Sequence, residues 1–210
     1  MIVVSDVAVR ENCRAIVDAC IEAYGRIDTL VNNAGITMWA KFDELADLGV
    51  MEKIMQINFF GSVYMTHYAL PHLKKTKGRI VGISSLTGKA GVPTRSLYAA
   101  SKHAMACFFD TLRIELSDTG VTVTMIYPGF VDTGVRERAF GADGKPLGKS
   151  PVREKEVMTV ETCAKLIAAA MEKRKRELIM TPRGKIALWL KLIAPQLVDR
   201  IAKKAIERGK

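Results

Sequence analysis

Strand-like and helix-like patterns alternate along this chain, and this alternation is the strongest constraint on its fold. Short runs rich in β-branched residues occupy residues 29–31, 79–83 and 121–126. Between and after them, apolar residues recur at three- and four-residue steps, as in residues 52–70 and 98–116, which is typical of helices. Strands that alternate with helices across short connections favour a parallel sheet. With 210 residues and 49% hydrophobic content, the chain is ample for one packed α/β domain.

The helix predicted at residues 98–116 carries a tyrosine and a lysine four positions apart, Tyr98 and Lys102. Positions i and i+4 lie one above the other on the same helix face, so the phenol and the ammonium interact. The cation favours the phenolate, and the tyrosine pKa is therefore expected to fall from about 10 toward the working pH. Such a tyrosine can exchange a proton with an alcohol or carbonyl oxygen. This spacing also arises by chance in many helices, so the surrounding sequence has to decide whether the pair is catalytic.

The context places further polar and small residues at the ends of the predicted strands. A hydroxyl at a strand end, beside the Tyr-Lys pair, can hydrogen-bond the same reacting oxygen. Small residues in a sharp turn after a strand let the backbone approach a ligand closely. The segments concerned are Ser84-Ser85 after the second strand, Asn32-Asn33-Ala34-Gly35 after the first, Tyr127-Pro128-Gly129 and then Asp132-Thr133 after the third, and Asn58 within a helical stretch.

In their order and spacing, these five motifs resemble the short-chain dehydrogenase/reductase family. The resemblance runs from Asp6 to Thr133, and more weakly to the C-terminus. The segment from Ser84 to Lys89, with Ser85 thirteen residues before Tyr98, is most similar to the hydroxysteroid-dehydrogenase-like branch. The resemblance implies a Rossmann-like, doubly wound parallel sheet and NAD or NADP as the cofactor.

The resemblance also assigns roles to four candidate catalytic residues. Tyr98 would be the general acid/base, and Lys102 would lower its pKa and hold the nicotinamide ribose. Ser85 would polarise the substrate oxygen, and Asn58 would hold a water molecule in the proton relay.

A second set of residues would bind the cofactor, together with Tyr98 and Lys102. The first strand's turn would line the cofactor cleft and support the sheet, the third strand's turn would face the nicotinamide, and an acidic residue near the N-terminus would meet the adenine. These residues are Asn32, Ala34 and Gly35, then Pro128, Gly129 and Thr133, and finally Asp6.

The chain departs from the family pattern at its N-terminus. The family's glycine-rich phosphate loop lies between the first strand and the first helix, but no glycine triplet occurs upstream of Asn32. Residues 1–7 instead resemble the family's third strand, so we expect a truncated domain that lacks the first two βα units, roughly 60 residues at about 30 per unit. The strand at 29–31 then has an open edge, on which residues 2–4 or a neighbouring chain would pair.

The leading functional hypothesis is hydride transfer between a nicotinamide cofactor and an alcohol or ketone. Residues 134–158 are long, contain glycine and proline, and are interpreted as a substrate lid. Their apolar members, Val135, Phe140 and Leu147, fit a hydrophobic alcohol or ketone better than a phosphorylated sugar. The alternative is a non-catalytic remnant or interaction protein that has lost cofactor binding, which the missing loop favours and the retained catalytic residues oppose.

Charge and composition narrow the choice of partners. The formal charge of +10 lies entirely in residues 134–210, and residues 184–210 form a basic amphipathic extension. This pattern fits packing against a partner subunit or over the active site, which we favour, or contact with a membrane surface. Basic residues without aromatic stacking platforms argue against nucleic acid.

The cysteines and histidines show no metal-ligand spacing, and the absence of a signal peptide or spanning segment predicts a cytoplasmic protein.

The helices predicted at residues 52–70 and 98–116 carry more apolar side chains than one sheet face can cover. We therefore expect them to pack against their copies in a homodimer or homotetramer. The aromatic residues that motivate this expectation are Phe59, Phe60, Tyr64, Phe108 and Phe109.

Overall fold

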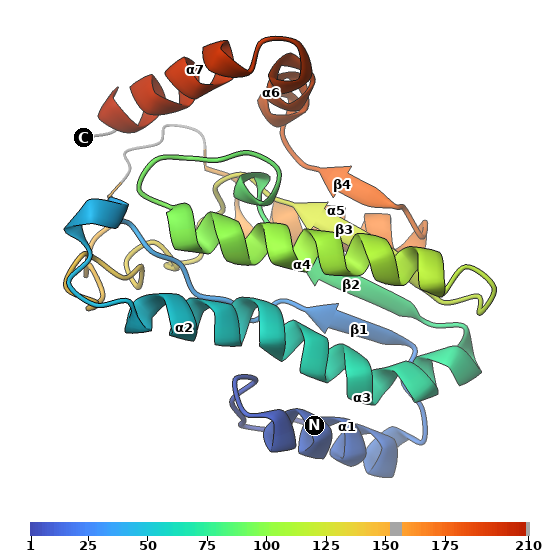
Figure 1. Ribbon diagram of the computed structural model, residues 1–210. Helices are drawn as coiled ribbons and strands as arrows, with labels where there is room; N and C mark the ends of the chain where they lie inside the picture. Colours follow the sequence, from blue (N-terminus) through green and yellow to red (C-terminus); the bar gives the residue numbers. More distant parts are fainter. Residues whose placement is uncertain (152–156, 209–210) are drawn as a thin grey trace.

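The computed structural model describes residues 1–151 and 157–208 and shows a four-stranded sheet flanked by helices (Figure 1). The strands are β1 (Thr29–Asn32), β2 (Arg79–Ile83), β3 (Thr122–Tyr127) and β4 (Glu177–Ile179). The α-helices are α1 (Arg10–Tyr24), α2 (Gly49–Met55), α3 (Gly61–Thr76), α4 (Ser96–Glu115), α5 (Val160–Glu172), α6 (Pro182–Ile193) and α7 (Pro195–Arg208). Short helical turns occupy Phe42–Glu44, Gln56–Phe60 and Leu86–Gly88.

All four strands run parallel in the order β1-β2-β3-β4. Each neighbour in the sheet is the next strand along the chain, so helices α2–α3, α4 and α5 serve as the crossovers. The register pairs Ile80 with Val123 and Ile126 with Leu178, which brings the carboxyl ends of the strands to one edge. Loops that follow those ends are therefore gathered at a single place.

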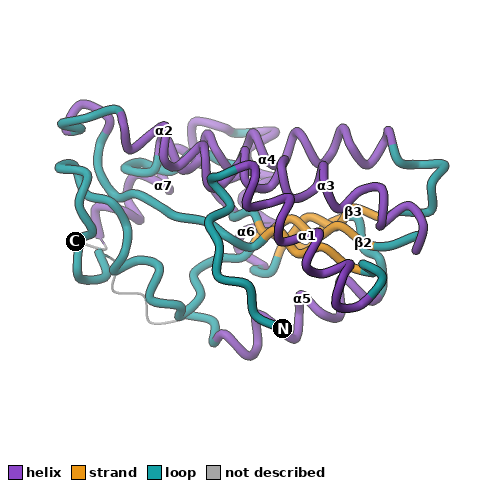
Figure 2. The backbone as a smooth tube through the Cα atoms, turned by 90° about the horizontal axis from the view of Figure 1, so that it is seen from below, coloured by secondary structure: helices purple, strands orange, loops and turns teal. Residues whose placement is uncertain are grey.

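The helices cover both faces of the sheet (Figure 2). On one face, α1, α3 and α4 enclose the largest apolar cluster, to which Leu73 and Phe109 contribute fully buried side chains. On the other face, α5 packs through Ala170 onto Val81 and Ile126. The parallel, doubly covered sheet and the Rossmann-like α/β class are confirmed. The three predicted strands are confirmed to within one residue at either end.

The predicted strand at residues 2–4 is wrong. The first six residues form no strand, and Ile2 and Val4 are 92% and 97% exposed. They do not pair with β1, which among the described residues has β2 alone as its neighbour in the sheet. A strand without a ladder partner leaves its amides to water, so β-branched composition alone does not hold residues 2–4 extended. Val31 is consequently 45% exposed on the edge strand β1.

Two details of the predicted helices are corrected by the packing. Phe109 lies in the core beneath α4 and is fully buried, so it contributes nothing to an outer surface. Phe60, by contrast, is 39% exposed and forms ring contacts with Phe59 and Tyr64. The helix at 98–116 begins two residues earlier than expected, at Ser96.

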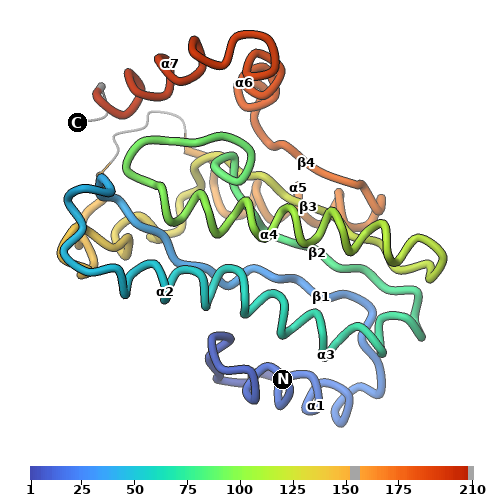
Figure 3. The backbone as a smooth tube through the Cα atoms, viewed as in Figure 1, coloured from blue at the N-terminus to red at the C-terminus, as the bar shows by residue number. Residues whose placement is uncertain are grey.

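The basic C-terminal extension folds as two helices that follow β4 (Figure 3). Thr181 begins α6 by accepting a hydrogen bond from the Gly184 amide, and Pro182 occupies the first turn, where its missing N–H costs nothing. Figure 1 shows α7 running from the end of α6 toward the side of the molecule where α2 begins. Of the helices described, none is long and apolar enough to cross a membrane.

Candidate active site

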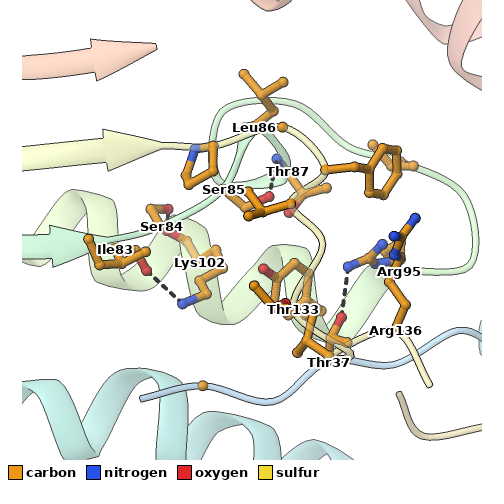
Figure 4. A pocket seen from close by; sticks show the side chains of 18 of the residues that line it. Thr37, Ile83, Ser84, Ser85, Leu86, Thr87, Arg95, Lys102, Thr133 and Arg136 are labelled. Carbon is orange, nitrogen blue, oxygen red and sulfur yellow. Dashed lines mark hydrogen bonds between the residues drawn. The ribbon is translucent and has the colours of Figure 1, made fainter. Parts of the chain in front are cut away.

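A cavity of about 650 Å³ opens at the carboxyl ends of the strands. Its walls come from the segments that follow β1, β2 and β3, from the start of α4, and from one face of α7. A crevice at this edge is where parallel α/β sheets bind their ligands. Figure 4 shows the side chains that face it.

Ser85 and Tyr98 meet inside this cavity. Ser85 directly follows β2 and caps the short turn Leu86–Gly88, where its Oγ accepts a hydrogen bond from the Thr87 amide at 3.3 Å. Tyr98 lies in the first turn of α4. The Ser85 hydroxyl is close enough to the phenol to lower the Tyr98 pKa. As predicted, the hydroxyl of Ser85 at the end of β2 thus lies beside the tyrosine of α4.

The predicted fall in the Tyr98 pKa is wrong for this structure. Burial raises the pKa of the phenol, and this effect exceeds the lowering caused by the Arg95 guanidinium and the Ser85 hydroxyl. Desolvation disfavours the charged phenolate, which explains the direction. The Lys102 ammonium lies 5.9 Å from the Tyr98 ring centroid, whereas the Arg95 guanidinium lies at 4.7 Å. Arg95 is therefore the nearer cation.

Lys102 is held beneath the cavity floor with spare hydrogen-bonding capacity. Its Nζ donates to the Ile83 carbonyl oxygen at 2.8 Å, and the residue is 4% exposed. Burial lowers the pKa of Lys102 to about 8, which still leaves it a cation at pH 7. An ammonium has three donors, and the hydrogen bond to the Ile83 carbonyl, drawn in Figure 4, uses one of them. The cavity side of Lys102 thus suits a ligand with acceptor oxygens.

Asn58 lies one layer behind the cavity and shapes its wall. It is fully buried in a π-helical turn, Gln56–Phe60, a rare distortion that is frequent at functional sites. Its Oδ1 accepts from the Ile36 amide at 2.8 Å, and its Nδ2 donates to the Ile36 carbonyl at 3.0 Å and to Ser101 Oγ at 2.9 Å. These bonds tie the segment after β1 to Ser101 of α4, the residue directly before Lys102.

The predicted cofactor residues separate into three groups. Most of them line the cavity, namely Ala34, Gly35, Pro128, Gly129 and Thr133. At Gly35 an added Cβ would lie 3.2 Å from Asn58 Oδ1 and 3.4 Å from Lys102 Nζ, so a side chain there would crowd Lys102. Asn32 is buried one step away, where its Nδ2 donates to Thr66 Oγ1 and ties β1 to α3.

Asp6 is the one predicted residue that the fold leaves apart from the others. It is exposed ahead of α1, and its Oδ1 accepts a hydrogen bond from the Ala8 amide at 2.9 Å. It does not line the cavity around Tyr98.

The cavity also contains residues that the sequence reasoning did not single out. Arg95 precedes Tyr98 by three residues, and that spacing was a usable signal because i and i+3 share a helix face. Trp39 and Arg136 reach the cavity from loops whose course no local pattern reveals. The contribution of α7, through Ala202, Ala205 and Ile206, likewise depends on tertiary packing.

Comparison with known proteins decides the family. The sequence pattern of the short chain dehydrogenase family matches residues 1–143. The chain belongs to the short-chain dehydrogenase family. Its relatives include the 11-beta-hydroxysteroid dehydrogenase-like protein 4A of Arabidopsis thaliana, 38% identical over 200 residues that cover 94% of this chain and 64% of the relative. Another, from Rattus norvegicus, is dehydrogenase/reductase SDR family member 7B, 38% identical over 184 residues, with 86% and 56% covered. This short-chain dehydrogenase thus falls in the hydroxysteroid-dehydrogenase-like branch.

Solved structures show the same fold. A short chain dehydrogenase from Burkholderia cenocepacia in complex with NADP superposes with a TM-score of 0.79 at 21% identity, covering 94% of this chain and 76% of that one. An alcohol dehydrogenase from Thermococcus sibiricus complexed with 5-hydroxy-NADP gives a TM-score of 0.69 at 22% identity, covering 84% and 72%. This short-chain dehydrogenase spans 64% or less of the length of the curated relatives named above.

Within residues 1–151 and 157–208, no group of three or more histidine, cysteine or carboxylate side chains is placed to hold a metal ion.

Proposed function

We propose that this protein contributes the catalytic half of an NAD(P)-dependent oxidoreductase that moves a hydride between nicotinamide and an alcohol or ketone. The observation that carries the proposal is the convergence of Tyr98, Ser85 and Lys102 on one cavity at the carboxyl edge of the sheet. Family membership and the NADP ligands of the structural relatives support the same cofactor class.

The cavity fits the nicotinamide half of such a cofactor. Lys102 has donors to spare for ribose hydroxyls, and the small residues Ala34 and Gly35 leave room beside it. Thr133, on the segment after Pro128 and Gly129, would meet the carboxamide. The bound cofactor would supply the hydride acceptor or donor, and the protein supplies orientation and a matched acid/base. No glycine-rich loop occurs upstream of Asn32, where the family pattern places the pyrophosphate loop.

The protein's own part in the reaction is a proton transfer at the Tyr98 hydroxyl. During ketone reduction the phenol gives its proton to the forming alkoxide, and during alcohol oxidation the phenolate takes the proton back. Ser85 donates a hydrogen bond to the same substrate oxygen and holds it at the phenol. Arg95 and Ser85 make the phenolate easier to form than burial alone allows. Asn58 positions the wall near Lys102 and is the candidate to hold a relay water.

The substrate side of the cavity is mainly apolar, with Leu86, Val92, Phe130 and Ile206 among its walls. This lining favours a hydrophobic alcohol or ketone. Val135 and Arg136 also line it, which supports a lid within residues 134–158. Phe140, expected to face the substrate, packs instead onto the separate apolar cluster around Met38, so it anchors the segment. Residues 152–156 of the proposed lid lie outside the described residues.

Turnover by a completed domain tests this proposal. A polypeptide in which two family-type βα units with a glycine-rich loop precede Met1 is expected to oxidise NADPH or NADH in the presence of an apolar ketone. The loss of reduced-nicotinamide absorbance gives the rate. The alternative, a non-catalytic remnant, predicts that the completed domain binds the cofactor but transfers no hydride to any ketone or from any alcohol in a broad panel.

We also propose that α2–α3 and α4 pack against their copies. Phe60 is 39% exposed and Ile114 on α4 is 71% exposed, while Phe59, Phe60 and Phe108 form a chain of ring contacts on this side. Light scattering at micromolar concentration is expected to give a dimer or tetramer, and the double variant Phe60→Lys, Ile114→Lys a smaller species. A monomeric parent protein would contradict the proposal.

The two C-terminal helices support different alternatives among those raised by their sequence, which were packing over the active site, packing on a partner subunit, and contact with a membrane surface. α7 forms part of the cavity wall, which favours packing over the active site. α6 leaves Trp189, Leu192 and Ile193 between 72% and 83% exposed. These side chains are available to a partner subunit, the option we favour, or to a membrane surface.

A further inference from the structure

Arg95 is a buried cation without an acidic partner among the described residues. The residue is 8% exposed and lies at the start of α4, three positions before Tyr98. Its guanidinium lies 4.9 Å from the Trp39 ring centroid, and its Nη2 donates to Thr37 Oγ1 at 2.7 Å (Figure 4). Its Nε is buried with no hydrogen-bond partner. Among the ion pairs of the described residues, none involves Arg95.

The contacts that Arg95 does make offset only part of the cost of burying its charge. Arginine cannot escape that cost by losing its proton, because it stays protonated in proteins. Ring faces and a neutral hydroxyl stabilise a cation less than a carboxylate does. Burial lowers the pKa of Arg95, and the nearby positive charge of Arg136 lowers it further. The site therefore has a surplus of positive charge that a bound anion would neutralise.

Arg136 adds a second guanidinium to the same end of the cavity. It follows β3, is partly buried, and lies 5.7 Å from the Phe130 ring centroid. Among the described residues that line the cavity, Arg95, Lys102, Arg136 and Arg138 are cationic, and none is acidic. This imbalance marks the cavity as one that attracts anions.

The four cations are not equivalent. Lys102 donates to the Ile83 carbonyl and faces the ribose side proposed above. Arg138 is exposed and donates to the Thr133 carbonyl at 3.4 Å. Arg95 and Arg136 remain, and both line the cavity among apolar walls, with the Arg95 guanidinium 4.7 Å from the Tyr98 ring centroid. Two planar guanidinium groups suit a carboxylate, which accepts paired hydrogen bonds from arginine.

We propose that Arg95 and Arg136 form a carboxylate-binding subsite, so that the substrate is an apolar hydroxy or keto acid whose reacting oxygen lies at Tyr98. This assignment rests on the proposed function for the identity of the reacting group. The subsite itself requires only that an apolar carboxylate binds in the cavity beside Trp39. It can therefore be tested without cofactor and without turnover.

Trp39 provides the signal for a binding experiment. The chain contains two tryptophans, and Trp189 is 72% exposed on α6, so Trp189→Phe leaves Trp39 as the single tryptophan, whose emission is excited selectively over that of the tyrosines. Decanoate and decanamide, which share a chain length and differ in charge, are titrated against this 210-residue protein below their aggregation concentrations. Decanoate is expected to change the Trp39 fluorescence and to bind about 10- to 100-fold more tightly than decanamide, the range for hydrogen bonds to charged groups.

Arg95→Gln and Arg136→Gln are each expected to weaken decanoate binding about 10-fold or more and to leave decanamide binding unchanged. Arg14→Gln is the matched control, because Arg14 is an exposed arginine of α1. If Arg95→Gln fails to fold by circular dichroism, Arg136→Gln carries the test, since Arg136 is only partly buried.

Three results would overturn the subsite. They are the absence of saturable decanoate binding, equal binding of decanoate and decanamide, and unchanged decanoate affinity in a folded Arg136→Gln protein. The two arginines could instead bind the cofactor phosphate, and a competition experiment with nicotinamide mononucleotide distinguishes this alternative from a substrate carboxylate. If the arginine variants weaken the mononucleotide and spare decanoate, the two arginines bind the cofactor phosphate and the proposal is wrong. If turnover fails while these binding results hold, the fault lies with the proposed function.

Discussion

Tyr98→Phe is expected to reduce turnover by about 10²–10⁴-fold in the completed domain, the usual contribution of general acid/base catalysis. The substitution removes the proton donor and almost no volume. The phenol's hydrogen-bonding neighbour, Ser85, is itself a cavity residue, so thermal stability and cofactor affinity should stay near those of the parent. Steady-state kinetics, calorimetric cofactor titration and thermal unfolding measure the three quantities. Residual activity above a tenth of the parent's would remove Tyr98 from the role.

Lys102→Ala serves as the contrasting variant in the same experiment. It removes a buried cation whose Nζ is bonded to the Ile83 carbonyl and leaves a void beside Gly35. We expect both turnover and cofactor affinity to fall, because a charge near the phenol and a ribose contact are lost together. A Lys102→Ala protein with normal cofactor affinity would show that the ribose is held elsewhere.

The 210-residue polypeptide by itself is expected to bind NAD(H) and NADP(H) more weakly than micromolar. In this fold the pyrophosphate is held by backbone amides at the N-terminus of a helix that opens with closely spaced glycines. The only glycine before Asn32 is Gly25, which ends α1 in a left-handed conformation, so it does not begin a helix. The nicotinamide contacts at Lys102 and Thr133 remain, but they are a minority of the cofactor's surface.

Calorimetric titration of the 210-residue polypeptide measures this prediction, and the completed domain is its control. The added βα units should restore micromolar or tighter binding, because they supply the phosphate loop and cover the open edge of β1 at Val31. Micromolar binding by the 210-residue polypeptide would contradict the prediction. It would mean that the cavity cations hold the pyrophosphate without a glycine loop.

The elements of the catalytic half could be predicted because their signals are local. Arg79–Ile83 is apolar on both faces, as a central parallel strand must be, and the strand formed where expected. The periodicity after Tyr98 required a helix, and the i, i+4 spacing then placed Lys102 on the same side of α4. Residues 2–4 had similar composition but no neighbouring strand to complete their hydrogen bonds, and they form no strand and are exposed.

The sequence by itself determined the family, the parallel sheet, and the residue types at the strand ends, since each depends on contacts within a few residues or one turn of helix. Only the tertiary structure decided the electrostatics. It buried Tyr98 so that desolvation outweighs the effects of Arg95 and Ser85 on the phenol pKa, and it brought Trp39, Arg136 and α7 to the same cavity. Burial and charge proximity depend on segments separated by tens to hundreds of residues, and no local pattern in the chain specifies how those segments meet.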